Sequence, residues 1–169
     1  AEVAADATLG PFLGETLKPL LGPYRDRFNV QNQIKRLREK AGNVEGGFRF
    51  IAMGDSRSQV DLWEAITIHI DRLDPKPLFV INAGDVILNG TAKEFADYYI
   101  PPLLNTDIPY FIAVGNHDIG KSGKKGTYEY LFGEQSLNFT FDVGKSRFII
   151  LDNVSGKMPW ENVLDMADE

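Results

Sequence analysis

The sequence predicts an α/β fold in which parallel strands alternate with helices. Three apolar runs carry this prediction, because each stops at a glycine followed by a polar residue. They are Phe48–Met53 before Gly54-Asp55, Leu78–Ala83 before Gly84-Asp85, and Phe111–Val114 before Gly115-Asn116-His117-Asp118. Ligands of open α/β sheets bind in the crevice outside the carboxyl ends of the strands. Three such endings therefore predict one shared site.

Size, composition and charge limit the classes of protein to consider. The 169 residues are enough for one domain, and no apolar run reaches the roughly eighteen residues of a transmembrane helix. A net charge of −6 argues against a general nucleic-acid-binding surface. The absence of cysteine excludes disulfides and zinc–thiolate sites. The chain begins at Ala1 without an initiator Met, which favours an exported protein after signal-peptide removal, or reflects an arbitrary boundary.

Residues 1–45 are expected to form an N-terminal arm followed by one helix. Residues 1–28 are rich in Gly and Pro, which predicts an extended arm packed on the domain. Residues 29–41 have apolar side chains at helical spacing, so we expect an amphipathic helix that ends at Gly42. The basic run Lys35-Arg36-Leu37-Arg38 is interpreted as the solvated face of this helix rather than as a phosphate-binding patch.

Two crossover helices are predicted between the three strands. Residues 58–73 have apolar side chains at helical spacing and stop at Asp74-Pro75. His69 lies in this helix and is interpreted as an ordinary helix residue rather than a metal ligand. A capping box, Thr91-Ala92-Lys93-Glu94, opens the second helix, and we expect Pro101-Pro102 to end it.

The last part of the chain is expected to add a loop, a hairpin and the start of a helix. The Gly- and Lys-rich residues 119–126 lack the spacing of a phosphate-binding loop, so we interpret them as a mobile loop at the edge of the site. A short helix follows at residues 128–132. Residues 137–142 and 147–151 flank a turn as a β-hairpin. Residues 158–169 begin another helix.

Four strand-end residues offer ligands for a metal: Asp55, Asp85, Asn116 and His117. Their oxygen and nitrogen donors suit Mn, Fe, Zn or Mg and do not suit soft metals. Two carboxylates that approach each other repel unless a cation lies between them. A metal pair bridged by one carboxylate activates a water and holds the attacking and leaving oxygens of a phosphoryl transfer.

The three strand-end motifs resemble the first three motifs of the calcineurin-like metallophosphoesterases, and the resemblance covers roughly residues 48–153. It implies an α/β fold built as a β-sandwich flanked by helices in αββα layers. Residues 46–169 would form the N-terminal portion of this domain, incomplete at its C-terminal end.

The resemblance also implies a role for each residue. Asp55 is a ligand of the first metal, Asp85 bridges the two metals, Asn116 binds the second metal, and His117 protonates the leaving group. The implied cofactor is a pair of divalent Mn, Fe or Zn ions. The implied reaction is hydrolysis of a phosphomonoester or phosphodiester by metal-activated hydroxide, on a phosphorylated small molecule or nucleotide-type substrate.

The chain departs from the family pattern at three places. Arg57 stands where the first motif normally has a metal-binding His, and we expect it to clamp the substrate while the first metal site is weakened. Leu88 replaces an Asp that orients the catalytic His in some relatives, so Asp118 is the candidate to orient His117. The later histidine motifs are missing, because the chain has only two histidines.

The missing motifs favour a chain that is the N-terminal part of a longer domain, through truncation, proteolysis or a shortened gene. Missing strands would leave an exposed sheet edge, where the chain could self-associate or bind a complementing segment.

Two other hypotheses stay open. The chain could be a catalytically incompetent half-domain that serves as a binding or interaction module. It could also be an unrelated phosphotransfer fold of the haloacid-dehalogenase type with Asp55 as nucleophile. The second aspartate of that motif is absent, because Arg57 stands in its place.

Overall fold

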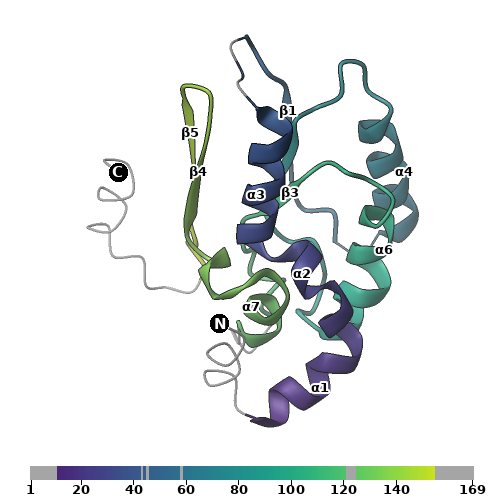
Figure 1. The fold of residues 1–169 in the computed structure, drawn as a ribbon. Coiled ribbons are helices and arrows are strands. Elements are labelled where there is room, and N and C mark those ends of the chain that lie inside the picture. The colour runs from purple at the N-terminus through teal and green to yellow at the C-terminus, as the bar shows by residue number, and fades with distance from the viewer. Residues whose placement is uncertain (1–10, 43, 45, 58, 121–124, 155–169) are drawn as a thin grey trace.

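The computed structural model describes residues 11–154, apart from residues 43, 45, 58 and 121–124 (Figure 1). Three parallel strands form one sheet in the order β1-β2-β3, and two antiparallel strands form a hairpin. The strands are β1 (Phe50–Met53), β2 (Phe79–Asn82), β3 (Tyr110–Ile112), β4 (Phe139–Val143) and β5 (Ser146–Ile150). The helices are α1 (Pro11–Leu21), η1 (Gly22–Tyr24), α2 (Arg25–Phe28), α3 (Val30–Ala41), α4 (Val60–Asp71), α5 (Ala92–Glu94), η2 (Phe95–Tyr99), α6 (Ile100–Leu103), α7 (Gly126–Phe132) and η3 (Glu134–Ser136).

The parallel sheet brings the ends of its three strands to one edge. β2 lies between β1 and β3, with Asn82 opposite Met53 on one side and opposite Ile112 on the other. Because both pairings are parallel, the carboxyl ends of all three strands meet at the same edge of the sheet. The predicted alternation of parallel strands and helices is confirmed.

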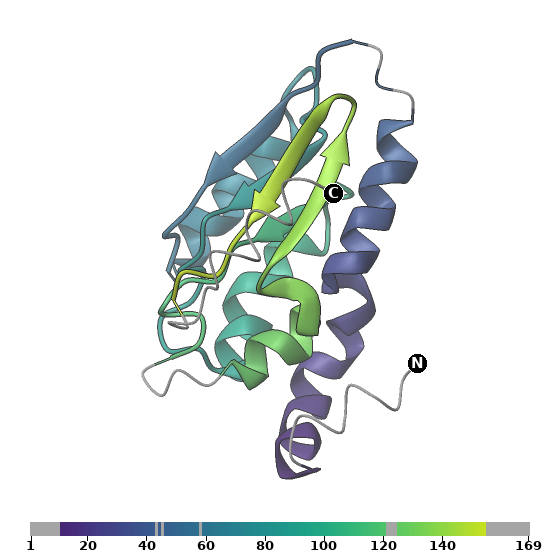
Figure 2. The same cartoon turned by 90° about the vertical axis from the view of Figure 1, so that its left-hand side faces the viewer.

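One face of the sheet packs on the hairpin formed by β4 and β5 (Figure 2). Phe79 of β2 and Phe111 of β3 point to this face, and their rings lie 5.4 and 4.3 Å from the ring of Phe141 between centroids. Phe148 of β5 contacts Phe79 at 5.0 Å. Apolar residues of α3 complete this core. The aromatic contacts hold the two β-layers face to face, as in the predicted sandwich.

The opposite face of the sheet is covered by helices. Val80, Tyr110 and Ile112 point to this side and share a core with α1, α4, α7 and the segment from η2 to α6. Trp63 of α4 stacks on Tyr99 at 5.5 Å and donates a hydrogen bond from its indole N–H to the Tyr99 carbonyl oxygen at 3.0 Å. The layers therefore run from helices through the parallel sheet to the hairpin, with α3 beside it. This is the mixed α/β architecture that the sequence predicts.

The N-terminal segment differs from its prediction. The sequence predicts an extended arm over residues 1–28, but the described part of that segment is helical from Pro11 to Phe28. Leu17 and Leu21 are buried in the core, whereas Pro19 is exposed on the outer side of α1. Burial of one apolar face stabilises a helix whose Gly and Pro content alone predicts none.

The sequence predicts that Pro101-Pro102 end the helix that begins after Thr91. This prediction is wrong, because the helical segment continues through both prolines to Leu103. The capping box of Thr91 and Glu94 is present, as predicted. The chain then widens into the π-helical segment η2, in which the Ile100 N–H donates to the Phe95 carbonyl oxygen, and continues as α6. The prolines lie in the first turn of α6, where a missing N–H costs least.

The other predicted elements that lie within the described residues are confirmed. Residues 29–41 form α3, whose first turn is capped by the Asn29 side chain accepting the Gln31 N–H. The short helix is α7 and the hairpin is β4–β5. The loop predicted at residues 119–126 lies partly, and the helix predicted at 158–169 wholly, outside the described residues. No helix of the described part is long and apolar enough to cross a membrane.

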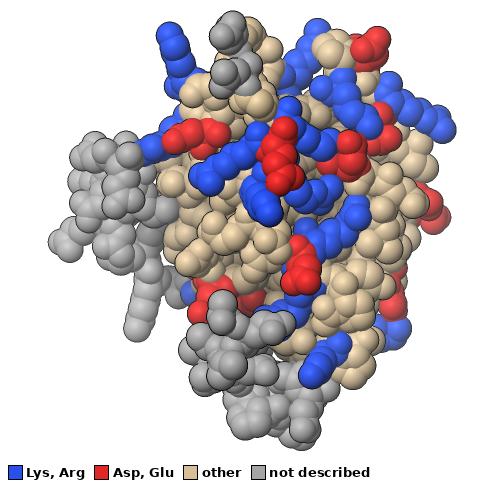
Figure 3. All heavy atoms as spheres, viewed as in Figure 1, with Lys and Arg blue, Asp and Glu red and all other residues tan. Residues whose placement is uncertain are grey.

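The basic run on α3 faces solvent among acidic groups. Lys35 and Lys40 are exposed, and they form ion pairs with Glu39 and Asp107. Figure 3 shows Lys and Arg side chains interleaved with Asp and Glu on the face that carries α3. This mixture agrees with the interpretation of a solvated helix face.

Candidate functional site

The carboxyl edge of the parallel sheet carries an open depression. Asp55 follows β1, Asp85 follows β2 and Asn116 follows β3, and all of them line this depression. Its other lining residues are Gly54, Ala83, Gly84, Val114, Gly115, Asn153 and Val154. The structure therefore brings together the residues that the sequence predicts as metal ligands. His69 lies elsewhere, exposed in the last turn of α4.

Backbone hydrogen bonds hold the loops after β1 and β2 against each other. The Asp55 N–H donates to the Gly84 carbonyl oxygen at 2.9 Å, and the Arg57 N–H donates to that of Asp85 at 3.0 Å. Asp55, Arg57 and Asp85 have φ angles of 59°, 31° and 54°, and no other non-glycine residue of the described chain has a positive φ. Such backbone is strained and persists where its surroundings fix it.

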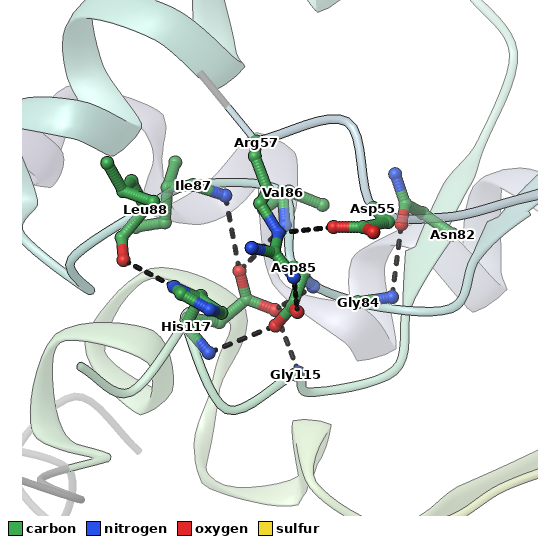
Figure 4. A network of polar contacts seen from close by, with 11 residues as sticks. Asp55, Arg57, Asn82, Gly84, Asp85, Val86, Ile87, Leu88, Gly115 and His117 are labelled. Carbon is green, nitrogen blue, oxygen red and sulfur yellow. Dashed lines mark hydrogen bonds and ion pairs between the residues drawn. The ribbon is translucent and has the colours of Figure 1, made fainter. Parts of the chain in front are cut away.

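Arg57 lies between the two carboxylates (Figure 4). Its Nε–H donates to Oδ1 of Asp55, and its Nη2 donates to Oδ2 of Asp85 at 3.3 Å. The Asp85 side chain is 16% exposed and that of Asp55 is 67% exposed. A guanidinium stays protonated at any working pH, so it cannot ligate a metal but does balance carboxylate charge. Arg57 therefore joins the predicted ligands through ion pairs.

Two glycines let the strand-end loops approach each other closely. A Cβ on Gly84, whose φ is 99°, would lie 2.7 Å from the backbone nitrogen of Gly115. A Cβ on Gly115 would lie 2.2 Å from Oδ1 of Asp85. Only glycine fits at these positions. Steric crowding thus explains why a glycine precedes the polar residue in these two motifs.

Asp118 has a role that differs from the predicted one. The sequence suggests that it orients His117, but its buried carboxylate instead accepts backbone N–H groups at 2.8 to 3.4 Å. The donors are Gly115, Asp85, Val86 and Ile87. Burial raises the pKa of Asp118 to about 6, against these hydrogen bonds, which favour the carboxylate. Asp118 therefore ties the loop after β2 to the loop after β3.

His117 is oriented by a backbone carbonyl. Its Nδ1 lies 2.7 Å from the carbonyl oxygen of Leu88, and its backbone N–H donates to Oδ1 of Asp85 at 3.0 Å. Because a carbonyl oxygen only accepts, Nδ1 carries the hydrogen and Nε2 is left as the second functional nitrogen. The Leu88 carbonyl thus fixes the orientation of the His117 ring.

Glu94 anchors the loop that carries Leu88. Its carboxylate accepts the backbone N–H groups of Asn89 and Thr91, the Asn89 side-chain amide and the Thr91 hydroxyl at 2.8 to 3.2 Å. Burial acts to raise the pKa of Glu94, but the hydrogen bonds from Thr91 and Asn89 together bring it below its ordinary value. The loop after β2 is therefore held at both ends, by Asp118 and by Glu94.

Sequence reasoning missed two polar residues at the site. Asn153 lines the depression just after the hairpin, and its position after a strand is a signal that could have identified it. Asn82 at the end of β2 is buried, and its Oδ1 accepts the Gly84 N–H at 3.1 Å. Its Nδ2 has no partner among the described residues. A buried donor of this kind suits a bound anion or water.

The donor set decides whether a divalent ion fits. Asp85 and Asn116 present carboxylate and amide oxygens, the ligands that hard divalent cations prefer, and Asn153 adds an amide. Asp55 is paired with Arg57, whose guanidinium cannot ligate a metal. No group of three or more His, Cys, Asp and Glu placed to hold a metal occurs among the described residues. Among the described residues, the oxygen donors of Asp85 and Asn116 suit a divalent ion, and the Arg57 guanidinium adds no metal ligand to them.

Comparison with known proteins gives a family match over most of the chain. Residues 48–167 match the sequence profile of the family described as calcineurin-like phosphoesterase. A probable glycerophosphodiester phosphodiesterase from Arcobacter nitrofigilis is 33% identical over 106 residues, which are 59% of this chain and 38% of that protein. Serine/threonine-protein phosphatases from Rattus norvegicus and Mus musculus are each 27% identical over 161 residues, 89% of this chain.

The chain spans 38% to 49% of the length of these curated relatives. No solved structure gives a significant match.

Proposed function

Because the chain belongs to the calcineurin-like phosphoesterase family, we propose that its strand-end site hydrolyses phosphoesters with the help of a divalent metal ion. The observation that supports this most is the convergence of Asp55, Asp85 and Asn116 on one open depression. Relatives named as a phosphodiesterase and as phosphatases point to diesters or monoesters of phosphate as the substrate class. Mn, Fe or Zn would serve, since all accept oxygen ligands.

Each site residue has a proposed task. Asp85 and Asn116 would hold the ion, with Asp55 beside them. When bound, the ion would lower the pKa of a water and so supply a nucleophile. Arg57, whose side chain is 41% exposed, presents guanidinium N–H groups that can hold a phosphate oxygen. His117, with its Nδ1–H fixed on Leu88, would act in its imidazolium form and give the Nε2 proton to the leaving oxygen.

A second candidate function is a non-catalytic binding module. It is favoured by the ion pairs of Arg57 with both carboxylates, which already satisfy part of the metal-ligand set. We also propose that the chain divides into an N-terminal part, residues 1–45, and a phosphoesterase portion, residues 46–169.

The decisive assay is hydrolysis of bis(4-nitrophenyl) phosphate and 4-nitrophenyl phosphate in Mn²⁺, with and without a chelator. The wild-type chain should turn over at least one of these esters only when metal is present. H117N should lower kcat by about 100-fold or more, because a positioned general acid contributes about that much. H69N is the matched control and should be unaffected. Turnover that survives the chelator, or that H117N leaves intact, would contradict the proposal, and no turnover at all would favour the binding module.

A further inference from the structure

The position of Arg57 bears on how many ions the site holds. Its guanidinium contacts the Asp55 carboxylate through Nε and the Asp85 carboxylate through Nη2. In Figure 4 the guanidinium reaches both carboxylates, with Asp55 to its right and Asp85 below it. Two carboxylates that contact the same side chain repel each other less when that side chain is a cation. In this chain an arginine side chain supplies that cation.

The backbone fixes this arrangement. Asp55, Arg57 and Asp85 are the non-glycine residues of the described part with positive φ angles, and the Arg57 N–H donates to the Asp85 carbonyl oxygen. A side chain that merely reached across the surface would not need such a backbone. The loop therefore presents Arg57 to the carboxylates in a defined way.

Charge balance argues against a second metal at the same place. The two carboxylates and the guanidinium together carry a single net negative charge. One divalent ion beside Asp85 reverses that charge, and a second would have to approach the fixed guanidinium at close range. Like charges at such distances in a partly buried site repel strongly. The Asp85 side chain, only 16% exposed, is in such a site.

We propose that Arg57 replaces one of two cations, so that this site binds a single divalent ion through Asp85 and Asn116, with Asn153 as a further donor. The inference rests on the proposed function only in taking these residues as metal ligands. It makes Arg57 a permanent part of the charged centre. The remaining guanidinium N–H groups, which have no partner among the described residues, then face the substrate.

The test is the number of Mn²⁺ ions bound per chain in wild type and two variants. Arg57→His removes the charge and adds a neutral nitrogen ligand. Arg57→Lys is the matched control, because a protonated lysine keeps the charge and cannot ligate. Each protein is equilibrated with Mn²⁺, its bound metal is measured by mass spectrometry, and its electron paramagnetic resonance spectrum is recorded. Circular dichroism confirms that each variant is folded.

Wild type and Arg57→Lys should each bind one Mn²⁺ per chain and give the spectrum of an isolated ion. Arg57→His should gain a second equivalent and show the exchange coupling of two ions that share a carboxylate. Two ions in wild type, or one ion in all three proteins, would overturn the inference while leaving metal binding itself intact. Absence of binding in all three would count against the metal ligands of the proposed function as well.

Discussion

Asp118 shows how one buried carboxylate organises the site without lining the depression. It lies directly after the Gly-Asn-His sequence, is fully buried and accepts N–H groups from both loops that it joins. A carboxylate with two oxygens can accept several donors at once, whereas an amide brings donors of its own. The positions of Asp85 and His117 therefore depend on Asp118.

Asp118→Asn should lower the free energy of unfolding by about 2–4 kcal/mol, because the new NH₂ group would face backbone N–H donors in a buried site. Urea unfolding followed by circular dichroism measures the change. Asp26→Asn, at an exposed position of α2, is the control and should change stability by less than about 0.5 kcal/mol. Equal effects of the two substitutions would show that the Asp118 network contributes little.

At the scale of single residues, the sequence identifies which side chains reach the site but not what each contacts. The Gly-polar endings were sufficient to place Asp55, Asp85 and Asn116 at one edge. The hydrogen-bond partners of the Asp118 and His117 side chains are backbone groups. Because nearly all residue types carry the same backbone groups, the sequence does not identify these partners. For this reason the sequence suggests an Asp118–His117 contact, whereas the structure shows His117 against the Leu88 carbonyl.

Among the elements, the loop after β2 depends on the helix that follows it. Glu94 closes the capping box and at the same time holds Asn89, next to the residue whose carbonyl orients His117. A buried carboxylate with several donors stabilises a loop through hydrogen bonds that an exposed side chain would lose to water. The helix cap and the site loop therefore form one unit.

Glu94→Gln should destabilise the chain by about 1–3 kcal/mol at neutral pH, since its NH₂ group would oppose the donors of Thr91 or Asn89. The folded pKa of Glu94 lies below the ordinary value of 4.5, so the unfolded state binds more protons in the window just below that value. The stability supplied by Glu94 is therefore present above this value and is lost as the pH falls through the folded pKa.

The stability difference between wild type and Glu94→Gln should accordingly shrink between about pH 6 and about pH 3. Urea unfolding at several pH values measures it. Glu64→Gln on the exposed face of α4 is the control and should show little difference at any pH. A difference that grows on acidification would contradict the account of Glu94.

Element prediction succeeded where apolar spacing was regular and failed where tertiary packing decided. The amphipathic spacing of α3 and its Asn29 cap are local signals that a sequence carries. The helix α1 contains Gly14 and Pro19, and it forms because Leu17 and Leu21 are buried against other elements. The π-helical segment before Pro101 likewise depends on the core that holds Tyr99.

At the scale of the whole molecule, the two edges of the parallel sheet differ in whether their backbone groups have hydrogen-bond partners. On the outer edge of β3, the Gln33 side chain accepts the Tyr110 N–H at 3.3 Å, and the Tyr128 hydroxyl donates to the Ile112 carbonyl oxygen at 2.9 Å. No strand of the described part pairs with the outer edge of β1. Unpaired edge strands are templates for pairing with another chain.

Self-association through β1 with a second copy of this chain stays a prediction. The carbonyl oxygens of Arg49 and Met53 and the N–H of Asp55 form hydrogen bonds toward β2. Because the backbone groups of successive residues in a strand point to opposite sides, the N–H of Ala52 points to the outer edge of β1. Ala52→Pro should therefore abolish association seen by sedimentation velocity without breaking the sheet, whereas Ala52→Ser, which keeps the N–H, should not. A wild type that stays monomeric at high concentration, or a proline variant that still associates, would disprove it.

The layered architecture of the whole molecule could be predicted because strand periodicity and strand-end glycines are encoded locally. Its aromatic interface could not, because the stacking of Phe111 on Phe141 pairs residues far apart in the chain. The ion pairs of Arg57 are of the same kind, since they depend on how closely two loops approach. The sequence predicts that the Arg57 guanidinium holds the substrate, but it does not predict the ion pairs of Arg57 with Asp55 and Asp85.

The most direct test of the central claim, that Asp85 and Asn116 of the strand-end site bind a divalent metal ion, is calorimetric titration of the chain with Mn²⁺. Wild type should bind with a Kd of about micromolar or tighter, and Asp85→Asn should weaken binding by at least about 10-fold. Asp61→Asn, at an exposed position of α4, should bind as wild type does. Absence of binding, or binding that Asp85→Asn leaves unchanged, would show that the chain keeps the motifs of the family without its metal site.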